Sequence, residues 1–472
     1  MTDGDTPETA GRGSEWSRRR AVAALSAGAG WLLTGTLTAA PARAAVAAGP
    51  AATAAPTPAP PGLPPGIPAQ RHVFVNWSGE VRTDALWTCA PRDAEEVVAL
   101  ADWAATHGWR LRPRGKRHTW APLAVADGTA GTERVVLLDT TAHLTTVSLD
   151  GPDTVRAGTG VLMEELLDFL GERGLGLTSC PAPGDLTLGG VLAIGGHGTA
   201  VPARGEERAP GQGYGSVSNR VVALTAVVWD EDAGRHVART FERADPTCAA
   251  LLVHLGRALV TEVVLRVEQD ATLRCVSTLD VPASRLFAAP EAAGSDSFAA
   301  FLDRTGRAEA IWFAFTDHPW LKTWQRSPRR PFASRAVDGP YNYPFSDSLP
   351  EPVARLAGEL AEGSWALTPL FGRLQYAVAR AALTGDISDL LLSDTLLRDL
   401  LDGEALRHLL AAGPRSDLWG ASRHLLLYIR PTTLRETADG YAVLVRRRDV
   451  QWVVHTFATL YRELLEGYAA RR

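Results

Sequence analysis

The chain has 472 residues, of which 46% are hydrophobic and 21% are charged, as is typical of globular proteins. This length predicts two or three domains with a sizeable core, which excludes a disordered chain and a small disulfide-rich scaffold. The net charge of −5, from 48 Lys and Arg against 53 Asp and Glu, gives no sign of a nucleic-acid binder.

An export signal is predicted in residues 1–44. The arginines Arg18 to Arg20 precede a weakly apolar stretch over 21–40, and Ala42-Arg43-Ala44 is a small-residue cleavage site. This layout is typical of a twin-arginine signal, so we expect a secreted protein. A membrane anchor is the alternative, because about 20 residues suffice to span a bilayer. Residues 45–70 read as a Pro/Ala linker that is too poor in packing side chains to join a core.

Strands and helices alternate irregularly along the rest of the chain, which predicts an α+β fold rather than a regular doubly wound sheet. One helix is expected over 93–106, with Asp93 as N-cap and Gly108 as its stop, and another over 163–171. Strands are expected at 109–112, 135–139, 144–149, 155–159, 175–178, 221–229 and 260–267.

Lysine and cysteine are scarce in this chain, and two common nucleotide-binding motifs do not occur, which limits the kinds of site that are expected. Only two of the 48 cations are lysines, Lys116 and Lys322, a skew that indicates codon composition and makes single arginines uninformative. No CxxC pair or Cys/His cluster occurs, so no metal site is expected. Buried thiols are predicted, with one disulfide after export as the alternative, for Cys89, Cys180, Cys248 and Cys275. A Rossmann GxGxxG motif and a P-loop motif are both absent.

The first candidate site is the loop that follows the expected strand at 109–112. Backbone N–H groups near Gly115 could cradle phosphate oxygens, with charge supplied by Arg114, Lys116 and Arg117. His118 lies at the mouth of this loop, and a neutral imidazole nitrogen is nucleophilic enough to carry a covalent cofactor bond. The alternative is a basic surface turn with a hydrogen-bonded histidine.

The second candidate site is the glycine-dense segment 181–199. It contains five glycines between Gly189 and Gly198. Such density costs backbone entropy, so we expect close approach of the backbone to a flat ligand or a phosphate. The apolar residues between the glycines argue against the alternative, a flexible linker.

Together the two segments resemble the flavin-contacting segments of the vanillyl-alcohol-oxidase type (PCMH-type) FAD-binding domain. From about Asn76 to the C-terminus, further segments are similar in order and spacing to the covalent-flavin (type II) cholesterol oxidase family. They include residues 76–80, 86–89, 181–184, 214–216, 224–229, 308–312, 339–343 and 417–420.

The resemblance implies a two-domain fold. A PCMH-type FAD-binding domain would occupy residues 71–268, and a substrate-binding cap domain of antiparallel sheet and helices would occupy residues 269–472. Family members continue beyond this length with a segment that carries a further glutamate and arginine. The resemblance therefore implies that the sterol-binding domain is truncated at its C-terminus.

The resemblance also implies the cofactor and the residues that hold it. FAD would be bound covalently through His118. The implied cofactor-binding residues are Arg114, Gly115, Lys116, Arg117, His118, Thr119, Pro183, Gly184, Thr187, Gly189, Gly190, Gly196, His197, Gly198 and Val263.

Glu309, within Ala308-Glu309-Ala310-Ile311-Trp312, is the implied catalytic residue. Apolar neighbours make a carboxylate a better proton acceptor near neutral pH. Taken from the residues alone, Glu309 reads instead as a strand residue that faces water. A sterol needs a large apolar pocket, and the candidates for its lining are Trp312, Phe313, Phe315, Trp320, Trp324, Tyr341, Tyr343, Phe345, Trp365, Phe371 and Tyr376.

The implied reaction converts a 3-hydroxysterol such as cholesterol to the 3-keto-4-ene steroid, with O2 reduced to H2O2. Two alternatives stay open: a steroid- or lipid-binding flavoprotein without turnover, and an oxidase of another alcohol or a sugar. The implied partners are sterol and O2, with no nucleic acid, and transient contact with membranes to extract sterol stays open.

Overall fold

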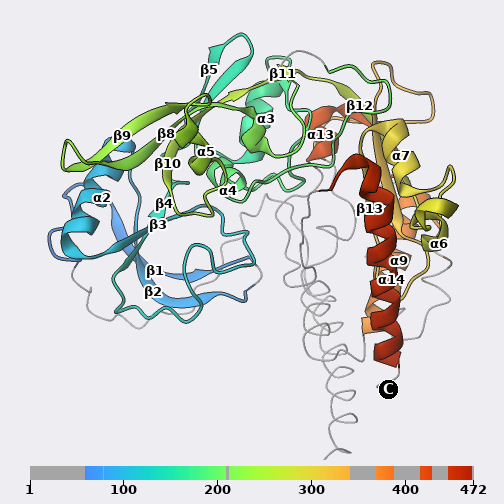
Figure 1. Ribbon diagram of the computed structural model, residues 1–472, viewed down its shortest axis with the longest axis horizontal. Coiled ribbons are helices and arrows are strands. Elements are labelled where there is room, and N and C mark those ends of the chain that lie inside the picture. Colours follow the sequence, from blue (N-terminus) through green and yellow to red (C-terminus); the bar gives the residue numbers. More distant parts are fainter. Residues whose placement is uncertain are drawn as a thin grey trace, which may run out of the picture.

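The computed structural model describes residues 59–77, 79–208, 212–340, 368–386, 388, 415–427 and 445–469. The predicted export signal and the linker up to residue 58 lie outside these residues. Figure 1 shows two halves, with the blue-to-green first half on the left and the yellow-to-red second half on the right. No described helix is long and apolar enough to cross a membrane.

The first half begins with a four-stranded sheet in the order β1-β2-β4-β3. Its strands are β1 (Ala69–Val75), β2 (Arg82–Cys89), β3 (Arg110–Arg114) and β4 (Val135–Asp139). Helix α2 (Ala94–His107) packs on one face of this sheet through Val97, Leu100 and Trp103. Asp93 caps α2 by accepting a hydrogen bond from the Glu96 N–H, and Gly108 ends it in the left-handed conformation (φ 66°), as predicted.

A five-stranded antiparallel sheet in the order β5-β6-β10-β8-β9 completes the first half. Figure 1 shows it in green above the blue sheet. Its strands are β5 (Val147–Gly151), β6 (Thr154–Gly158), β8 (Val221–Asp230), β9 (Arg235–Glu242) and β10 (Leu259–Arg266). Around it lie α3 (Met163–Gly171), α4 (Leu188–Ala193), η1 (Val217–Arg220), α5 (Pro246–Leu252) and the short pair β7 (Leu175–Gly176) and β11 (Glu268–Gln269).

The second half is a five-stranded sheet in the order β13-β14-β12-β16-β15, flanked by helices. Its strands are β12 (Thr272–Thr278), β13 (Ala308–Ile311), β14 (Trp320–Arg326), β15 (Arg335–Val337) and β16 (Asp417–Ala421). The helices are α6 (Ala283–Leu286), η2 (Pro290–Ala292), α7 (Phe298–Thr305), α9 (Thr368–Thr384), α13 (Ser422–Leu426), η4 (Arg447–Asp449) and α14 (Val450–Ala469). This mixed helix and sheet architecture confirms the α+β fold class.

One hydrophobic core spans both halves. It joins Val263 and Leu166 of the first half to Trp324, Leu273 and Leu418 of the second half, each at most 1% exposed. A shared core of this kind holds the two halves together by apolar burial, worth roughly 25 cal/mol per Å². The four cysteines are free and buried, which confirms the predicted thiols.

The expected linker is wrong at its C-terminal end, because part of it packs on α2. Ile67 is only 8% exposed within the core that α2 forms, and the Trp103 Nε1–H donates to the Pro61 carbonyl at 3.0 Å. Ala69 and Gln70 already belong to β1. Pro/Ala composition alone therefore did not show that one isoleucine anchors this segment.

Candidate functional site

The two predicted glycine segments meet in the structure. β3 ends at Arg114, and Gly115 comes so close to α4 that a Cβ there would lie 2.1 Å from the Thr187 Oγ1. Thr187 is the N-cap of α4 and accepts a hydrogen bond from the Gly190 N–H at 3.3 Å. Only glycine permits this contact, so the two loops form one surface.

His118 connects the two segments directly. Its Nε2 lies 2.8 Å from the Asp185 Oδ2, across 67 residues of sequence. The Trp77 ring stacks on the imidazole, with ring centroids 5.7 Å apart. In the neutral tautomer whose Nε2–H donates to Asp185, Nδ1 carries the lone pair. The histidine is thus a held nucleophile rather than a freely rotating surface side chain.

Polar groups around His118 fit a bound flavin. Among the described residues, three buried polar atoms here have no hydrogen-bond partner: Trp77 Nε1, Trp120 Nε1 and Asp185 Oδ1. Buried polar groups are rarely left unpaired, since each one costs about 1–3 kcal/mol. A heterocycle with ring nitrogens and carbonyl oxygens supplies such partners, so these residues fit FAD.

The expected phosphate-binding cations divide into two kinds. Arg114 binds the Asp139 carboxylate at 2.6 Å, so its charge is already compensated. Lys116 and Arg117 are both exposed. Arg117 adopts a left-handed backbone (φ 63°), and its carbonyl accepts a hydrogen bond from the Trp77 N–H at 2.8 Å. The loop is therefore fixed in shape, with Lys116 and Arg117 on its exposed side.

The other predicted cofactor residues lie in the two glycine segments, with one exception. Gly184 lies against Glu164, Gly189 against Thr159 and Gly196 against Val191, each closer than a Cβ would allow. Pro183 precedes Gly184, and Thr119 donates through Oγ1 to the Ala121 carbonyl at 3.2 Å. The exception is Val263, which is 0% exposed in β10 and paired with strands on both sides. The structure therefore places Val263 in the core rather than at the site.

Gly198 shows how tightly the second segment is folded. A Cβ there would lie 2.5 Å from the Cys180 carbonyl oxygen, which is backbone and cannot move aside cheaply. We expect Gly198→Ala to destabilise the protein by about 1–3 kcal/mol, measured by thermal unfolding. Gly294→Ala is the matched control, because nothing lies within 4 Å of that position. Equal stability of the two variants would contradict the close approach.

A cavity of about 180 Å³ brings Glu309 to the end of the second glycine segment. His197, Gly198 and Ala182 line one side, and Glu309 and Trp324 line the other. The cavity is lined mainly by apolar atoms, which suits a hydrophobic ligand with one polar group. Glu309 therefore lies at the wall of a largely apolar cavity, and its catalytic role stays a prediction.

No role was predicted for Lys322, although it contacts Glu309. Its Nζ lies 3.1 Å from the Glu309 Oε1, and its side chain is fully buried. Burial lowers the pKa of Lys322, and the Glu309 carboxylate opposes this effect. The sequence signal was the rarity of lysine in a chain that uses arginine almost everywhere. Asp185 was missed too, although it lies inside the glycine segment.

The predicted aromatic lining is only partly described. Trp324 lines the cavity, whereas Trp320 is fully buried and does not line it. Trp312 and Phe315 contact Tyr461 and Tyr468 of α14 instead. Tyr341, Tyr343, Phe345, Trp365 and the side chain of Phe371 lie outside the described residues.

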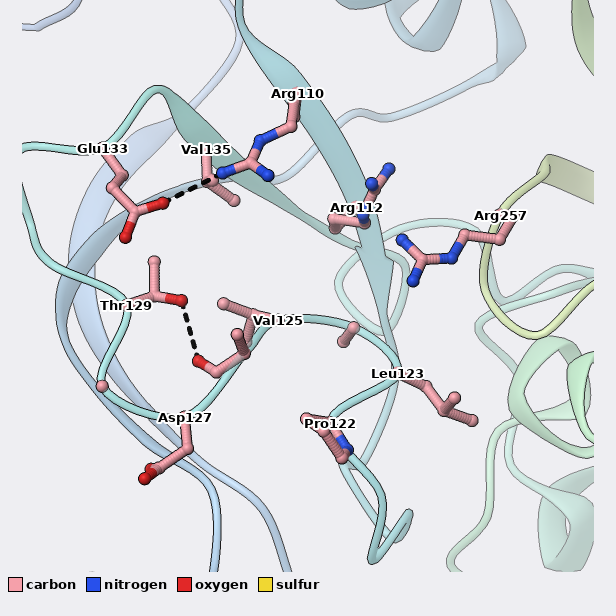
Figure 2. A pocket seen from close by; sticks show the side chains of 13 residues that line it. Arg110, Arg112, Pro122, Leu123, Val125, Asp127, Thr129, Glu133, Val135 and Arg257 are labelled. Atoms are coloured by element: carbon pink, nitrogen blue, oxygen red, sulfur yellow. Dashed lines mark hydrogen bonds and ion pairs between the residues drawn. The ribbon is translucent and has the colours of Figure 1, made fainter.

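Figure 2 shows a larger cavity, of about 250 Å³, beside β3. Arg110, Arg112 and Arg257 line it, and Arg110 binds Glu133 at 3.0 Å. Burial and the two neighbouring arginines lower the pKa of Arg112. This charged lining does not suit a sterol, and it contains none of the predicted site residues.

Comparisons with known proteins agree with this geometry. A family model for the substrate-binding domain of cholesterol oxidase matches residues 272–393 and 401–472, and one for an FAD-binding domain matches residues 86–231. The solved structure of a solvent-stable cholesterol oxidase is 46% identical, with a TM-score of 0.77, over 87% of this chain and 72% of that chain. Cholesterol oxidase from Brevibacterium sterolicum is 38% identical, with a TM-score of 0.76, over 89% and 72%.

A curated relative is more distant. L-gulonolactone oxidase 3 from Arabidopsis thaliana is 24% identical over 205 residues, which is 42% of this chain and 33% of that protein. The chain thus spans about a third of the length of the curated relatives that it matches.

Proposed function

Because the chain belongs to the cholesterol oxidase family, we propose that it is an FAD-dependent sterol oxidase. It converts a 3-hydroxysterol such as cholesterol to the 3-keto-4-ene steroid and reduces O2 to H2O2. The observation that carries this proposal is the cavity in which Glu309 of one half faces His197 and Gly198 of the other half. This arrangement lets one ligand contact a proton acceptor and the glycine segment together.

The first half holds the cofactor in this proposal. The loop from Gly115 to Thr119 would bind the diphosphate through backbone N–H groups, with the exposed Lys116 and Arg117 in the same loop. FAD, when bound, would accept the hydride from the carbon that bears the hydroxyl and would pass the electrons to O2. The unpaired polar atoms of Trp77, Trp120 and Asp185 would form hydrogen bonds with polar atoms of its ring system.

His118 is proposed as the point of covalent attachment. Asp185 accepts the hydrogen bond from Nε2 and so orients the lone pair of Nδ1 outwards. Trp77 restricts the ring by stacking on it. A fixed tautomer and a fixed ring plane are what a nucleophilic histidine needs.

Asp185→Asn tests this orientation. An amide can donate to the imidazole as well as accept from it, so the tautomer is no longer enforced. We expect the fraction of flavin that survives acid precipitation to fall, while total flavin before precipitation stays high. An unchanged acid-stable fraction would remove Asp185 from the attachment.

Glu309 acts on the substrate hydroxyl. Its carboxylate would accept the proton from the hydroxyl oxygen while the hydride leaves the carbon that bears this oxygen. The lining near Trp324 is apolar, so the hydroxyl of a bound sterol would form its hydrogen bond with the Glu309 carboxylate. His197 lies at the same cavity and orients the ligand from the opposite side.

The proposal is tested on the protein from Ala45 onward. The protein is denatured in acid and run on a gel, and flavin fluorescence is sought in the band. Peroxide release is then measured with cholesterol, with a sugar lactone and with a simple primary alcohol. A fluorescent band and peroxide from cholesterol alone support the proposal.

Other outcomes favour the alternatives. Flavin without turnover of any alcohol would favour a steroid- or lipid-binding flavoprotein. Peroxide from the lactone would favour a sugar oxidase, in line with the weak similarity to L-gulonolactone oxidase 3.

Secretion is part of the same proposal. It is supported by Arg18 to Arg20 and by the Ala42-Arg43-Ala44 cleavage motif in the sequence. N-terminal sequencing of the exported protein tests it, with Ala45 as the expected first residue.

A further inference from the structure

Lys322 occupies an environment that is unfavourable for a cation. It is one of two lysines in the chain, and its side chain is 0% exposed. Moving an ammonium group out of water is costly unless nearby groups compensate its charge. Burial accordingly lowers the pKa of Lys322. A buried cation in contact with Glu309, which lines the proposed substrate cavity, therefore calls for a specific role.

The strands around Lys322 supply that compensation. Trp320, Lys322 and Trp324 alternate along β14 and so share one face of the sheet. The ammonium lies 4.6 Å from the Trp320 ring centre and 5.6 Å from the Trp324 ring centre. Glu309 is its direct cross-strand partner on β13, with Nζ and Oε1 3.1 Å apart. The ammonium is thus fixed by two aromatic faces and one carboxylate.

We infer that Lys322 is a positioning residue, which keeps Glu309 ionised and holds its carboxylate at the cavity without touching the substrate. A cation at this distance stabilises the ionised form of a carboxylate. Glu309 is 22% exposed while Lys322 is fully enclosed, so the glutamate alone reaches the cavity. The inference deepens the proposed function and rests on it.

The chemistry of the two cations explains why lysine occurs here in an arginine-rich chain. A guanidinium is broad and planar and carries five donors, whereas an ammonium is a compact point charge. The space between two indole rings and a strand backbone suits the smaller group. Arginine would also direct donors at groups other than Glu309.

Other titratable side chains lie near this pair. Cys275 approaches Lys322 from β12, and Cys180 and His197 line the cavity on the opposite half. Burial raises the pKa of the Cys180 thiol to about 12, so it stays neutral. Histidine is the side chain among these whose type titrates near neutral pH. Any assignment of a pH effect to Glu309 must therefore be separated from His197.

Lys322→Met tests the inference through the pH profile of kcat/KM for cholesterol oxidation by the flavin-loaded enzyme. Without the cation the Glu309 carboxylate protonates more readily, so we expect the acid limb to move about 1–3 pH units higher. Arg274→Met is the matched control, because Arg274 binds Asp417 at 2.7 Å in the same sheet, away from the cavity. That variant should leave the acid limb in place.

Each outcome decides the inference. An unmoved acid limb in a folded, flavin-loaded Lys322→Met enzyme would overturn it, as would an equal shift in Arg274→Met. An acid limb that Glu309→Gln leaves unchanged in its residual activity belongs to another group, such as His197, and would overturn it too. If Lys322→Met does not fold, Lys322→Gln keeps a polar side chain of similar length without the charge.

A second readout needs no turnover, so failure of the proposed function stays distinguishable. Infrared spectra recorded against pH, with the Glu309→Gln spectrum subtracted, report the protonated carboxyl band of Glu309. A band that appears at higher pH in Lys322→Met than in the parent protein supports the inference, even if cholesterol is not the substrate. Bands that appear at the same pH overturn it.

Discussion

Glu309→Gln is expected to lower kcat for cholesterol by about 100- to 10,000-fold, the usual contribution of a positioned proton acceptor. The amide keeps the size of the side chain and accepts a hydrogen bond from the Lys322 ammonium, but it cannot take up the hydroxyl proton. Because Glu309 lies on β13 and not in the His118 loop, flavin content should stay at the parental level. Steady-state peroxide release and the flavin-to-protein absorbance ratio measure both effects.

The matched control for this substitution is Glu262→Gln. Glu262 is also a strand carboxylate bound to a cation, with the Arg156 Nη1 at 2.6 Å, but it does not line the cavity. It should leave turnover close to the parental value. An equal loss in both variants would show that a missing ion pair, not proton transfer, limits the rate. An unchanged rate in Glu309→Gln would remove this residue from the reaction.

His118→Ala is expected to abolish flavin that survives acid precipitation. Alanine has no nucleophilic nitrogen, whereas the two glycine segments keep their shape and would still hold FAD by non-covalent contacts. We therefore expect some FAD in the native protein, none in the acid-precipitated pellet, and lower turnover. Fluorescence of the pellet and of the supernatant separates these populations.

His236→Ala is the control for the loss of a histidine that is paired with an aspartate. His236 pairs with Asp102 at 2.8 Å in the same domain, in the manner of His118 with Asp185. Its removal should leave the acid-stable flavin intact. Flavin retained in the pellet of the His118→Ala variant would show that another residue carries the bond.

Several elements of the fold followed from local patterns. The helix over Ala94–His107 has its cap and its stop where Asp93 and Gly108 indicated, and α3 and β4 have the predicted bounds. Strong periodicity and side-chain caps are properties of short segments, so they can be recognised without the tertiary structure. β5 begins later than expected, at Val147. Leu144 lies in the loop before it, where its carbonyl contacts Gly158 and accepts a hydrogen bond from the Gly160 N–H.

Other features depended on distant residues and were not predicted. β1 and β2 carry polar side chains at several positions, so their alternation of apolar and polar residues is weak. They form strands because they pair with each other. The contact of His118 with Asp185 and that of Glu309 with Lys322 are also set by packing. Glu309 was found through a motif resemblance, whereas Lys322 needed the register of β13 and β14.

The order of strands in the second sheet has a consequence for biosynthesis. β12 lies between β14 and β16, and the Arg274 to Asp417 ion pair joins residues 143 positions apart. Contacts of such long range form slowly, because a long loop must close before they stabilise anything. All the strands of the two sheets in the first half lie before residue 267 and can pair earlier during synthesis. The sheet that carries Glu309 is completed only after residue 421 is made, so the cofactor-binding half can form before any alcohol can be oxidised.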